Sequence, residues 1–202
     1  MTSTKLILGI GNPDENYQNT RHNVGFMFLD YFARRSLGED ESAKTTNNKI
    51  IWEFDKKSNS LISKIKLAKP SAVLYLAKPL CYVNKSGEAI IKLAKFYKIK
   101  PENIIVIQDD LDIEFGNFKN SFGKNSGGHK GIESVIKSLK TKKFHRLRIG
   151  IAIRALKKVR KQTDKKRDVF IMNFVLSKFS SKDMEMIKKI FPEAYKRLLQ
   201  II

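Results

Sequence analysis

The sequence predicts a single α/β domain, a twisted mixed β-sheet with helices on both faces. Three observations favour this fold. Strand-like apolar runs alternate with segments of helical periodicity along the chain, as in α/β proteins. The 202 residues, 42% of them hydrophobic, are enough for one core. Charged residues interrupt every apolar run before the roughly 18 residues of a membrane helix. We therefore expect one soluble domain over residues 1–202, without a membrane segment or a secretory signal.

The first half of the chain is predicted to run strand, loop, helix and then three strands. Residues 5–10 are expected to form a buried strand whose apolar part is 6–10, and Val24, Phe28 and Phe32 then recur at helical spacing. A polar Thr/Asn-rich stretch ends this unit. Three strand-like runs follow at residues 50–54, 60–67 and 73–77.

The second half is predicted to alternate helices and strands. Its expected helices cover residues 87–97, a segment after the Gly-rich loop 123–128, and residues 182–199, where Pro192 starts or kinks the second part. Its expected strands cover residues 103–107, 115–122, 147–153 and 169–176. Residues 154–168 are rich in Lys and Arg and poor in apolar residues, so we expect an exposed basic loop there.

The charge of the chain favours a polyanionic partner. Lys plus Arg number 40 and Asp plus Glu 20, which gives a formal net charge of +20. A composition biased towards Lys, Asn and Ile explains part of this excess, so the charge favours a nucleic-acid partner without proving it. Cys81 is the only cysteine, which excludes an internal disulfide or a thiolate cluster and favours a reducing, cytoplasmic compartment.

Common catalytic motifs do not fit this sequence. After Gly9-Ile-Gly11 the third glycine of a dinucleotide-binding loop would fall at Asp14. The Gly-rich loop 123–128 is followed by His129 and Lys130, not by the Lys-Ser/Thr of a phosphate-binding loop. The serine elbow G-x-S-x-G is absent, and the histidines lack zinc-ligand spacing. A hydrolase with this sequence would activate water directly, with no metal or cofactor.

The polar residues that remain unexplained gather at predicted strand ends. In an α/β sheet the carboxyl ends of the strands are where sites assemble. An isolated histidine is more often structural than catalytic, but a nearby Asp would fix its tautomer and raise its basicity. These residues are Asn12, His22, Asn23, Asn84, Asp109 and Gly127-Gly128-His129.

Six ordered blocks resemble the bacterial-type peptidyl-tRNA hydrolase family over nearly the whole chain. They are GIGNPDENYQNTRHNVG, LCYVNKSGEAI, IVIQDDLDIEFG, GGHKGIESVI, FHRLRIGI and FVLSKF. The resemblance implies hydrolysis of the ester that joins a peptide to the 3′ end of a tRNA, by a monomeric enzyme. It implies that His22 is the general base and that Asp109 orients it.

The resemblance also implies roles for the residues around this pair. Asn12 and Asn84 would hold the peptide and ester groups, and His129 and Lys130 would also contact the substrate. Tyr17 and Tyr82 match positions in the walls of the family's site, although a structural role is equally consistent with the sequence. Basic residues at two family positions, Lys119 and Arg148, would contact the tRNA phosphates, which fix register without reading sequence.

Three departures from the family pattern accompany the resemblance. Lys130 replaces the asparagine that helps to position the ester and its water, and a lysine cannot accept a hydrogen bond. Asp14 replaces a glycine after the Asn-Pro pair. The segment 154–168 looks longer and more basic, with eight Arg and Lys between Arg154 and Arg167. Lys130 and this segment favour an alternative, a non-catalytic RNA-binding relative, whereas retention of both His22 and Asp109 argues against it.

Overall fold

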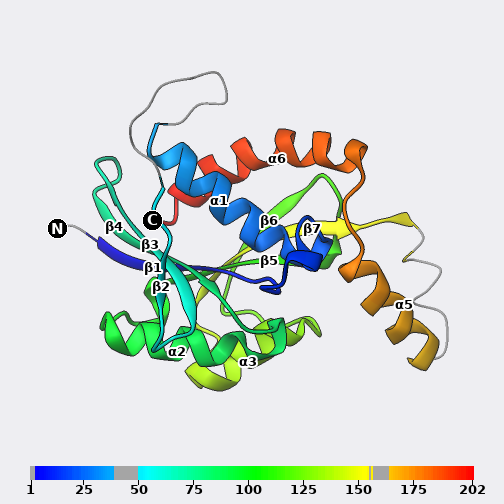
Figure 1. The fold of residues 1–202 in the computed structure, drawn as a ribbon, viewed down its shortest axis with the longest axis horizontal. Helices are drawn as coiled ribbons and strands as arrows, with labels where there is room; N and C mark the ends of the chain where they lie inside the picture. Colours follow the sequence, from blue (N-terminus) through cyan, green and yellow to red (C-terminus); the bar gives the residue numbers. More distant parts are fainter. Residues whose placement is uncertain (1–2, 39–49, 155, 157–163) are drawn as a thin grey trace.

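The computed structural model describes residues 3–38, 50–154, 156 and 164–202. Their strands form one mixed sheet in the order β2-β3-β4-β1-β5-β7-β6 (Figure 1). The central strands β4, β1, β5 and β7 are parallel, and β2, β3 and β6 run antiparallel to their neighbours. The strands are β1 Ser3–Gly9, β2 Glu53–Asp55, β3 Ser60–Leu67, β4 Ala72–Pro79, β5 Ile104–Glu114, β6 Phe118–Phe122 and β7 His145–Ala152.

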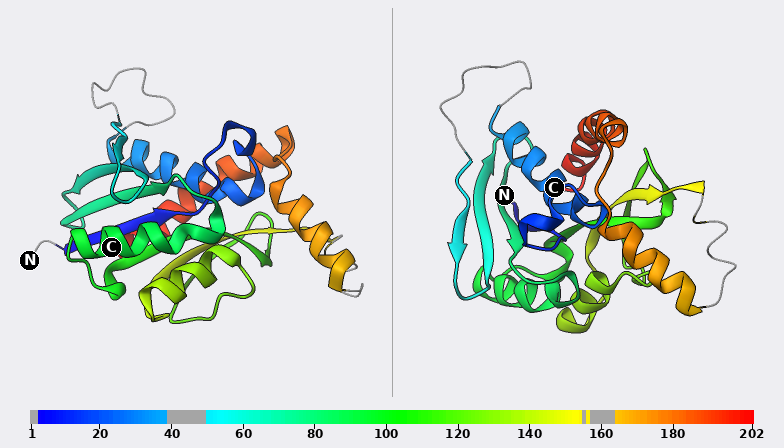
Figure 2. Two further views of the ribbon diagram at one scale, coloured as in Figure 1. Left: turned by 60° about the horizontal axis from the view of Figure 1, so that its bottom comes forward. Right: turned by 45° about the vertical axis from the view of Figure 1, so that its right-hand side comes forward.

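Helices cover both faces of this sheet, as the sequence predicts. Helices α1 (Val24–Ser36) and α6 (Ser181–Leu199) lie on one face, and α2 (Ser86–Phe96) and α3 (Lys130–Leu139) lie on the other (Figures 1 and 2). Helix α5 (Asp164–Leu176) projects from the side of the molecule beyond β7. Short 3-10 turns, η1 Glu15–Tyr17, η2 Arg21–Asn23, η3 Val83–Lys85 and η4 Pro101–Asn103, lie in the connections.

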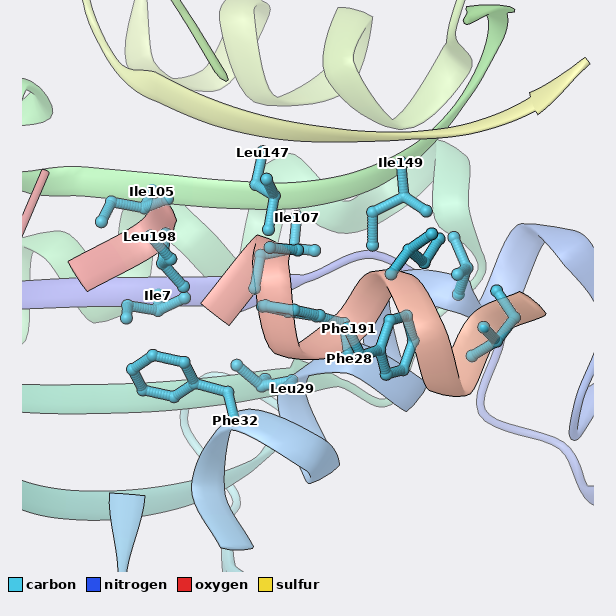
Figure 3. Packing of buried hydrophobic residues seen from close by; sticks show 14 of the residues in the cluster. Ile7, Phe28, Leu29, Phe32, Ile105, Ile107, Leu147, Ile149, Phe191 and Leu198 are labelled. Carbon is cyan, nitrogen blue, oxygen red and sulfur yellow. The ribbon is translucent and has the colours of Figure 1, made fainter. Parts of the chain in front are cut away.

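Strand β5 shows why the central strands read as unbroken apolar runs. Ile105 and Ile107 pack into the core under α1 and α6, whereas Ile104 and Val106 pack into the core under α2 and α3. A strand buried on both faces loses the alternation of polar and apolar residues. Figure 3 shows Phe28 and Phe191 meeting over the sheet on the first face, with ring centres 5.1 Å apart.

Helix α1 begins unusually close to the sheet because its first turn contains Gly25. A Cβ atom at this position would lie 2.5 Å from the carbonyl oxygens of Ile10 and Ile107, closer than Cβ atoms approach other atoms in proteins. The absence of a side chain therefore lets the helix start directly against the end of β1 and the last residue of β5 that pairs with it. This close approach places η2, immediately before α1, at the carboxyl edge of the sheet.

The structure corrects several predicted boundaries and one element type. Strand β5 continues to Glu114 instead of ending at residue 107, because β7 pairs with it beyond the end of β1. Strands β2 and β6 are shorter than the predicted 50–54 and 115–122. The predicted kink at Pro192 does not divide α6, which is one helix from Ser181 to Leu199.

The prediction of a strand at residues 169–176 is wrong, because this segment belongs to helix α5. Its many β-branched and aromatic residues suggest a strand, but Phe170, Ile171, Phe174 and Val175 turn towards the protein while Val169 and Met172 are exposed. That spacing is helical. The predicted basic loop 154–168 is also wrong for residues 154, 156 and 164–168, which are helical. Residues 155 and 157–163 lie outside the described residues.

Candidate active site

Two segments far apart in the sequence bring His22 and Asp109 together. His22 lies in η2, and Asp109 lies in β5 two residues beyond its last pairing with β1. The His22 Nδ1 and the Asp109 Oδ1 are 2.8 Å apart. Asp109 is almost completely buried and His22 is partly exposed. The pair therefore consists of a carboxylate inside the protein and an imidazole that can meet a ligand.

A second histidine binds the same carboxylate oxygen. His129 Nε2 lies 3.0 Å from Asp109 Oδ1, and its Nδ1 accepts from the backbone N–H groups of Gly131 and Ile132 at 3.1 and 3.4 Å. His129 is thus the N-cap of α3. Because its Nδ1 is an acceptor, the proton of the neutral ring is on Nε2 and is donated to Asp109.

These contacts fix the tautomer of His22. An ionised carboxylate only accepts hydrogen bonds, so Nδ1 of His22 carries the proton and Nε2 keeps its lone pair. Burial by itself lowers the pKa of His22, but the charge of Asp109 and its hydrogen bond outweigh burial and leave that pKa raised. Burial opposes ionisation of Asp109, yet attraction and hydrogen bonds from His22 and His129 hold its pKa well below the usual range. The result is a strengthened base with a fixed orientation.

Among the described residues, His22, Asp109 and His129 form a group that could bind a metal ion, since their ligand atoms lie within 4.8 Å of one another. A cation would have to displace the protons on His22 Nδ1 and His129 Nε2, since both nitrogens donate to one oxygen. The remaining nitrogen of His129 is already bound to the backbone of α3. This hydrogen-bond geometry suits proton transfer better than metal ligation.

Asn12 is held next to this cluster by a residue to which the sequence assigned no role. The Asn23 carboxamide accepts from the Asn12 backbone N–H and donates to its carbonyl, both at 2.9 Å. The Asn12 side-chain oxygen accepts from the Val83 N–H at 3.1 Å. This leaves the Asn12 amide NH₂ as the group that can donate to a ligand. The position of Asn23, immediately after His22, was the available signal.

The two tyrosines and Asp14 form one wall beside the loop after β1. Tyr17 and Tyr82 meet edge to face, with ring centres 6.4 Å apart. The Tyr82 hydroxyl donates to Asp14 Oδ2 at 3.2 Å, and the charge of Asp14 raises the pKa of Tyr82. Asp14, which replaces the family's glycine, therefore binds Tyr82 in this wall and does not join the His22 cluster. Asn84 is exposed in η3, two residues after Tyr82.

The remaining predicted residues lie in two places. Lys130 does not join the His22 cluster: its side chain is 74% exposed and forms an ion pair with Glu133 at 3.2 Å. Lys119 and Arg148 are cross-strand partners on β6 and β7, so the structure brings these two together. Arg148 Nε also donates to the buried carboxylate of Asp110 at 2.7 Å, which fixes the direction of its guanidinium.

A cavity of about 360 Å³ lies beside Asn12 and is lined by residues of α1, β3 and β4. Lys78 and Asp30 form an ion pair on its wall. The Lys78 ammonium group also lies 4.4 Å from the centre of the Trp52 ring. Other residues lining the cavity include Gln18, Asn19, Asn23, Phe26 and Met27.

Comparison with known proteins identifies the family. The family model described as "Peptidyl-tRNA hydrolase" matches residues 6–202. The chain belongs to the peptidyl-tRNA hydrolase family. Its activity is therefore hydrolysis of the peptidyl-tRNA ester, and the alternative of a non-catalytic RNA-binding relative is not favoured.

Relatives and solved structures of the family cover most of the chain. A peptidyl-tRNA hydrolase of Aquifex aeolicus is 36% identical over 200 residues, which is 98% of this chain and 90% of the relative. One of Mycobacterium ulcerans is 46% identical over 151 residues, 75% of this chain and 72% of the relative. The crystal structure of the Acinetobacter baumannii enzyme matches with a TM-score of 0.79 at 27% identity, covering 100% of this chain and 89% of that one.

Proposed function

We propose that His22 is the general base of the hydrolysis and that Asp109 and His129 are the groups that orient it. The observation that carries this proposal is the shared Asp109 oxygen, which binds both imidazole N–H groups and leaves Nε2 of His22 unprotonated. A base with a raised pKa and a fixed lone pair suits the abstraction of a proton from water.

The reaction runs in two steps that need neither a metal nor a covalent enzyme intermediate. His22 Nε2 takes a proton from water as the water oxygen bonds to the ester carbonyl carbon. The imidazolium that forms is stabilised by the charge of Asp109. The bond from that carbon to the 3′ oxygen of the tRNA then breaks, and His22 returns the proton to that oxygen. The products are the free peptide acid and tRNA.

Amide donors around His22 support charge development on the carbonyl oxygen. The Asn12 NH₂ is the group left to donate, since its side-chain oxygen is bound by Val83. Asn84 provides a second amide from η3, and the Tyr17–Tyr82 wall borders the loop that carries Asn12. Donors of this kind stabilise a tetrahedral intermediate more than the ground state.

The tRNA would lie along the basic side of the molecule. Lys119 and Arg148 form an adjacent pair on β6 and β7, and Lys165 and Lys166 are exposed on the projecting helix α5. Contacts with phosphate oxygens bind every tRNA alike and weaken steeply with salt. The substrate's origin in translation favours a cytoplasmic location, and the family resemblance favours a monomer, which the mass of the purified protein in solution would test. In the described residues, no helix is both long and apolar enough to cross a bilayer.

The deciding experiment measures release of tRNA from N-acetyl-aminoacyl-tRNA by the wild-type protein and by His22→Ala. We expect the variant to lose about 10² to 10⁴ in kcat, the worth of a general base, while it still binds the tRNA. His145→Ala is the matched control, since His145 lies on β7 against Phe122. Unchanged turnover in His22→Ala refutes the proposal, as does an equal loss in the control.

Lys130→Asn tests the largest departure from the family sequence. Because Lys130 is paired with Glu133 on the surface of α3, the wild-type lysine leaves the His22 cluster intact. We therefore expect the wild-type protein to be active, and we expect Lys130→Asn to be faster because an asparagine, unlike a lysine, can both donate and accept a hydrogen bond next to the ester. Activity that appears only in Lys130→Asn would instead favour a protein retained for RNA binding.

A further inference from the structure

Arg21, the residue before His22, reaches from η2 to the junction between helices α5 and α6. Its Nη1 donates to the Ser177 hydroxyl at 2.7 Å and to the carbonyl oxygens of Lys178 and Ser177 at 2.8 and 3.3 Å. Its Nη2 forms an ion pair with Asp183 at 3.0 Å. The side chain is only 14% exposed. One guanidinium therefore binds four acceptors on three residues.

The face of the same guanidinium is covered by two aromatic rings. Its carbon lies 4.8 Å from the centre of the Phe174 ring and 5.2 Å from that of Phe179. Both distances are within the range of a cation–π contact. A planar group with several donors can fill this position, whereas a lysine ammonium would satisfy only part of it.

These contacts join three elements. Ser177 and Lys178 directly follow α5, where the last carbonyls of a helix attract a cation. Asp183 belongs to the capping box that starts α6. The backbone adds an Arg21 N–H bond to the Ser177 carbonyl at 3.1 Å and a Phe179 N–H bond to the Asn19 carbonyl at 2.8 Å. The turn that carries His22 is thus attached to the end of α5 and the start of α6.

We propose that Arg21 is a positioning residue, which holds the His22 ring against Asp109 by anchoring η2 to the α5–α6 junction. The turn η2 has only three residues, so its own hydrogen bonds cannot fix it. The start of α1 holds it on one side through the close approach at Gly25, and Arg21 holds it on the other. This inference rests on the proposed role of His22 as the base.

The structure predicts how loss of this anchor differs from general destabilisation. A catalytic group displaced by about 1 Å costs about a hundredfold in rate. A looser η2 lengthens the contact between His22 and Asp109, and the pKa of His22 then falls towards its ordinary value. Lys119 and Arg148, which would contact the tRNA, lie on β6 and β7 and not on η2, whereas Lys165 and Lys166 lie on α5, whose end Arg21 binds. We therefore expect the main loss in kcat, with a smaller change in KM.

The test compares wild type with Arg21→Lys, Arg21→Ala and Asp183→Asn, and takes Arg34→Lys, an exposed arginine of α1, as the matched control. We measure kcat, KM, the pH dependence of kcat/KM, and the titration of the His22 ring by NMR with labelled histidine. We expect Arg21→Lys to lose about ten- to a hundredfold in kcat, with its acid limb and the His22 titration moved to lower pH. Asp183→Asn should change them in the same direction by less.

If Arg21→Ala does not fold, Arg21→Lys still tests the proposal. An unchanged kcat and an unchanged His22 titration in Arg21→Lys, with only a lower Tm, would overturn the proposal and leave Arg21 a structural residue. Failure of the proposed function gives a different result: His22→Ala keeps its turnover, whereas the His22 titration still reports whether Arg21 holds the ring.

Discussion

Replacing Asp109 by asparagine tests the central contact of the site without changing its shape. In wild type one oxygen accepts from His22 at 2.8 Å and from His129 at 3.0 Å. The new amide has no charge, and its NH₂ can donate to His22 Nδ1, which favours the tautomer with a protonated and inactive Nε2. Asp109→Asn thus removes both the charge that strengthens the base and the contact that aims it.

The size of the expected effect follows from these two losses. A hydrogen bond to a charged group contributes about 1.5–3 kcal/mol, which corresponds to about ten- to two-hundredfold in rate. The wrong tautomer adds to this. We expect kcat/KM to fall by about 10² to 10³, within the whole worth of a general base.

The pH dependence of kcat/KM shows in which direction the pKa of His22 changes in this variant. Only neutral His22 is a base, so activity rises with pH through the pKa of His22. Asp109 raises that pKa, and its loss must move the acid limb of kcat/KM to lower pH. Asp112→Asn, which removes an exposed carboxylate from the same strand, should leave the limb in place. A limb that stays in place in Asp109→Asn, or turnover within threefold of wild type, would refute the assignment.

Two further substitutions separate catalysis from stability. His129→Asn keeps a side-chain acceptor for the N-terminus of α3 but loses the bond to Asp109; we expect turnover to fall with Tm nearly unchanged, whereas a large drop in Tm would show that the ring mainly supports the helix. Phe28→Ala removes a fully buried ring that packs on Phe191, so urea unfolding should show a loss of about 3–5 kcal/mol. Phe96→Ala is its comparison: this ring is 66% exposed, and an equal loss there would contradict the assignment of the core.

Much of the fold could be predicted because the central strands are buried on both faces. Runs such as those in residues 5–10 and 103–107 are typical of strands in the middle of a sheet that is covered on both faces. Apolar residues at helical spacing identify α1, α2 and α3. Helix α5 was missed because its composition is that of a strand. Its end is fixed by tertiary contacts, among them the bonds of Arg21 to Ser177 and Lys178, and local periodicity does not contain those contacts.

The candidate site was predictable in part for a similar reason. Motif resemblance nominated His22, Asp109 and His129, and the structure places all three at one carboxylate oxygen. The motif resemblance does not indicate that Asn23 holds Asn12, because these two hydrogen bonds join a side chain to the backbone of another segment. The surface position of Lys130 could not be predicted either, since it depends on the ion pair with Glu133.

The contact between Lys78 and Trp52 places a charged side chain of the cavity wall against an indole ring. Trp52 is the only tryptophan in the chain, so all indole emission comes from one place. The ammonium group of Lys78 lies over its ring and also lines the cavity beside Asn12. Indole emission responds to a nearby charge, and a molecule that enters the cavity and draws Lys78 away changes the field at the ring. A molecule that binds in this cavity and displaces Lys78 would therefore change the fluorescence of Trp52 in the unlabelled protein.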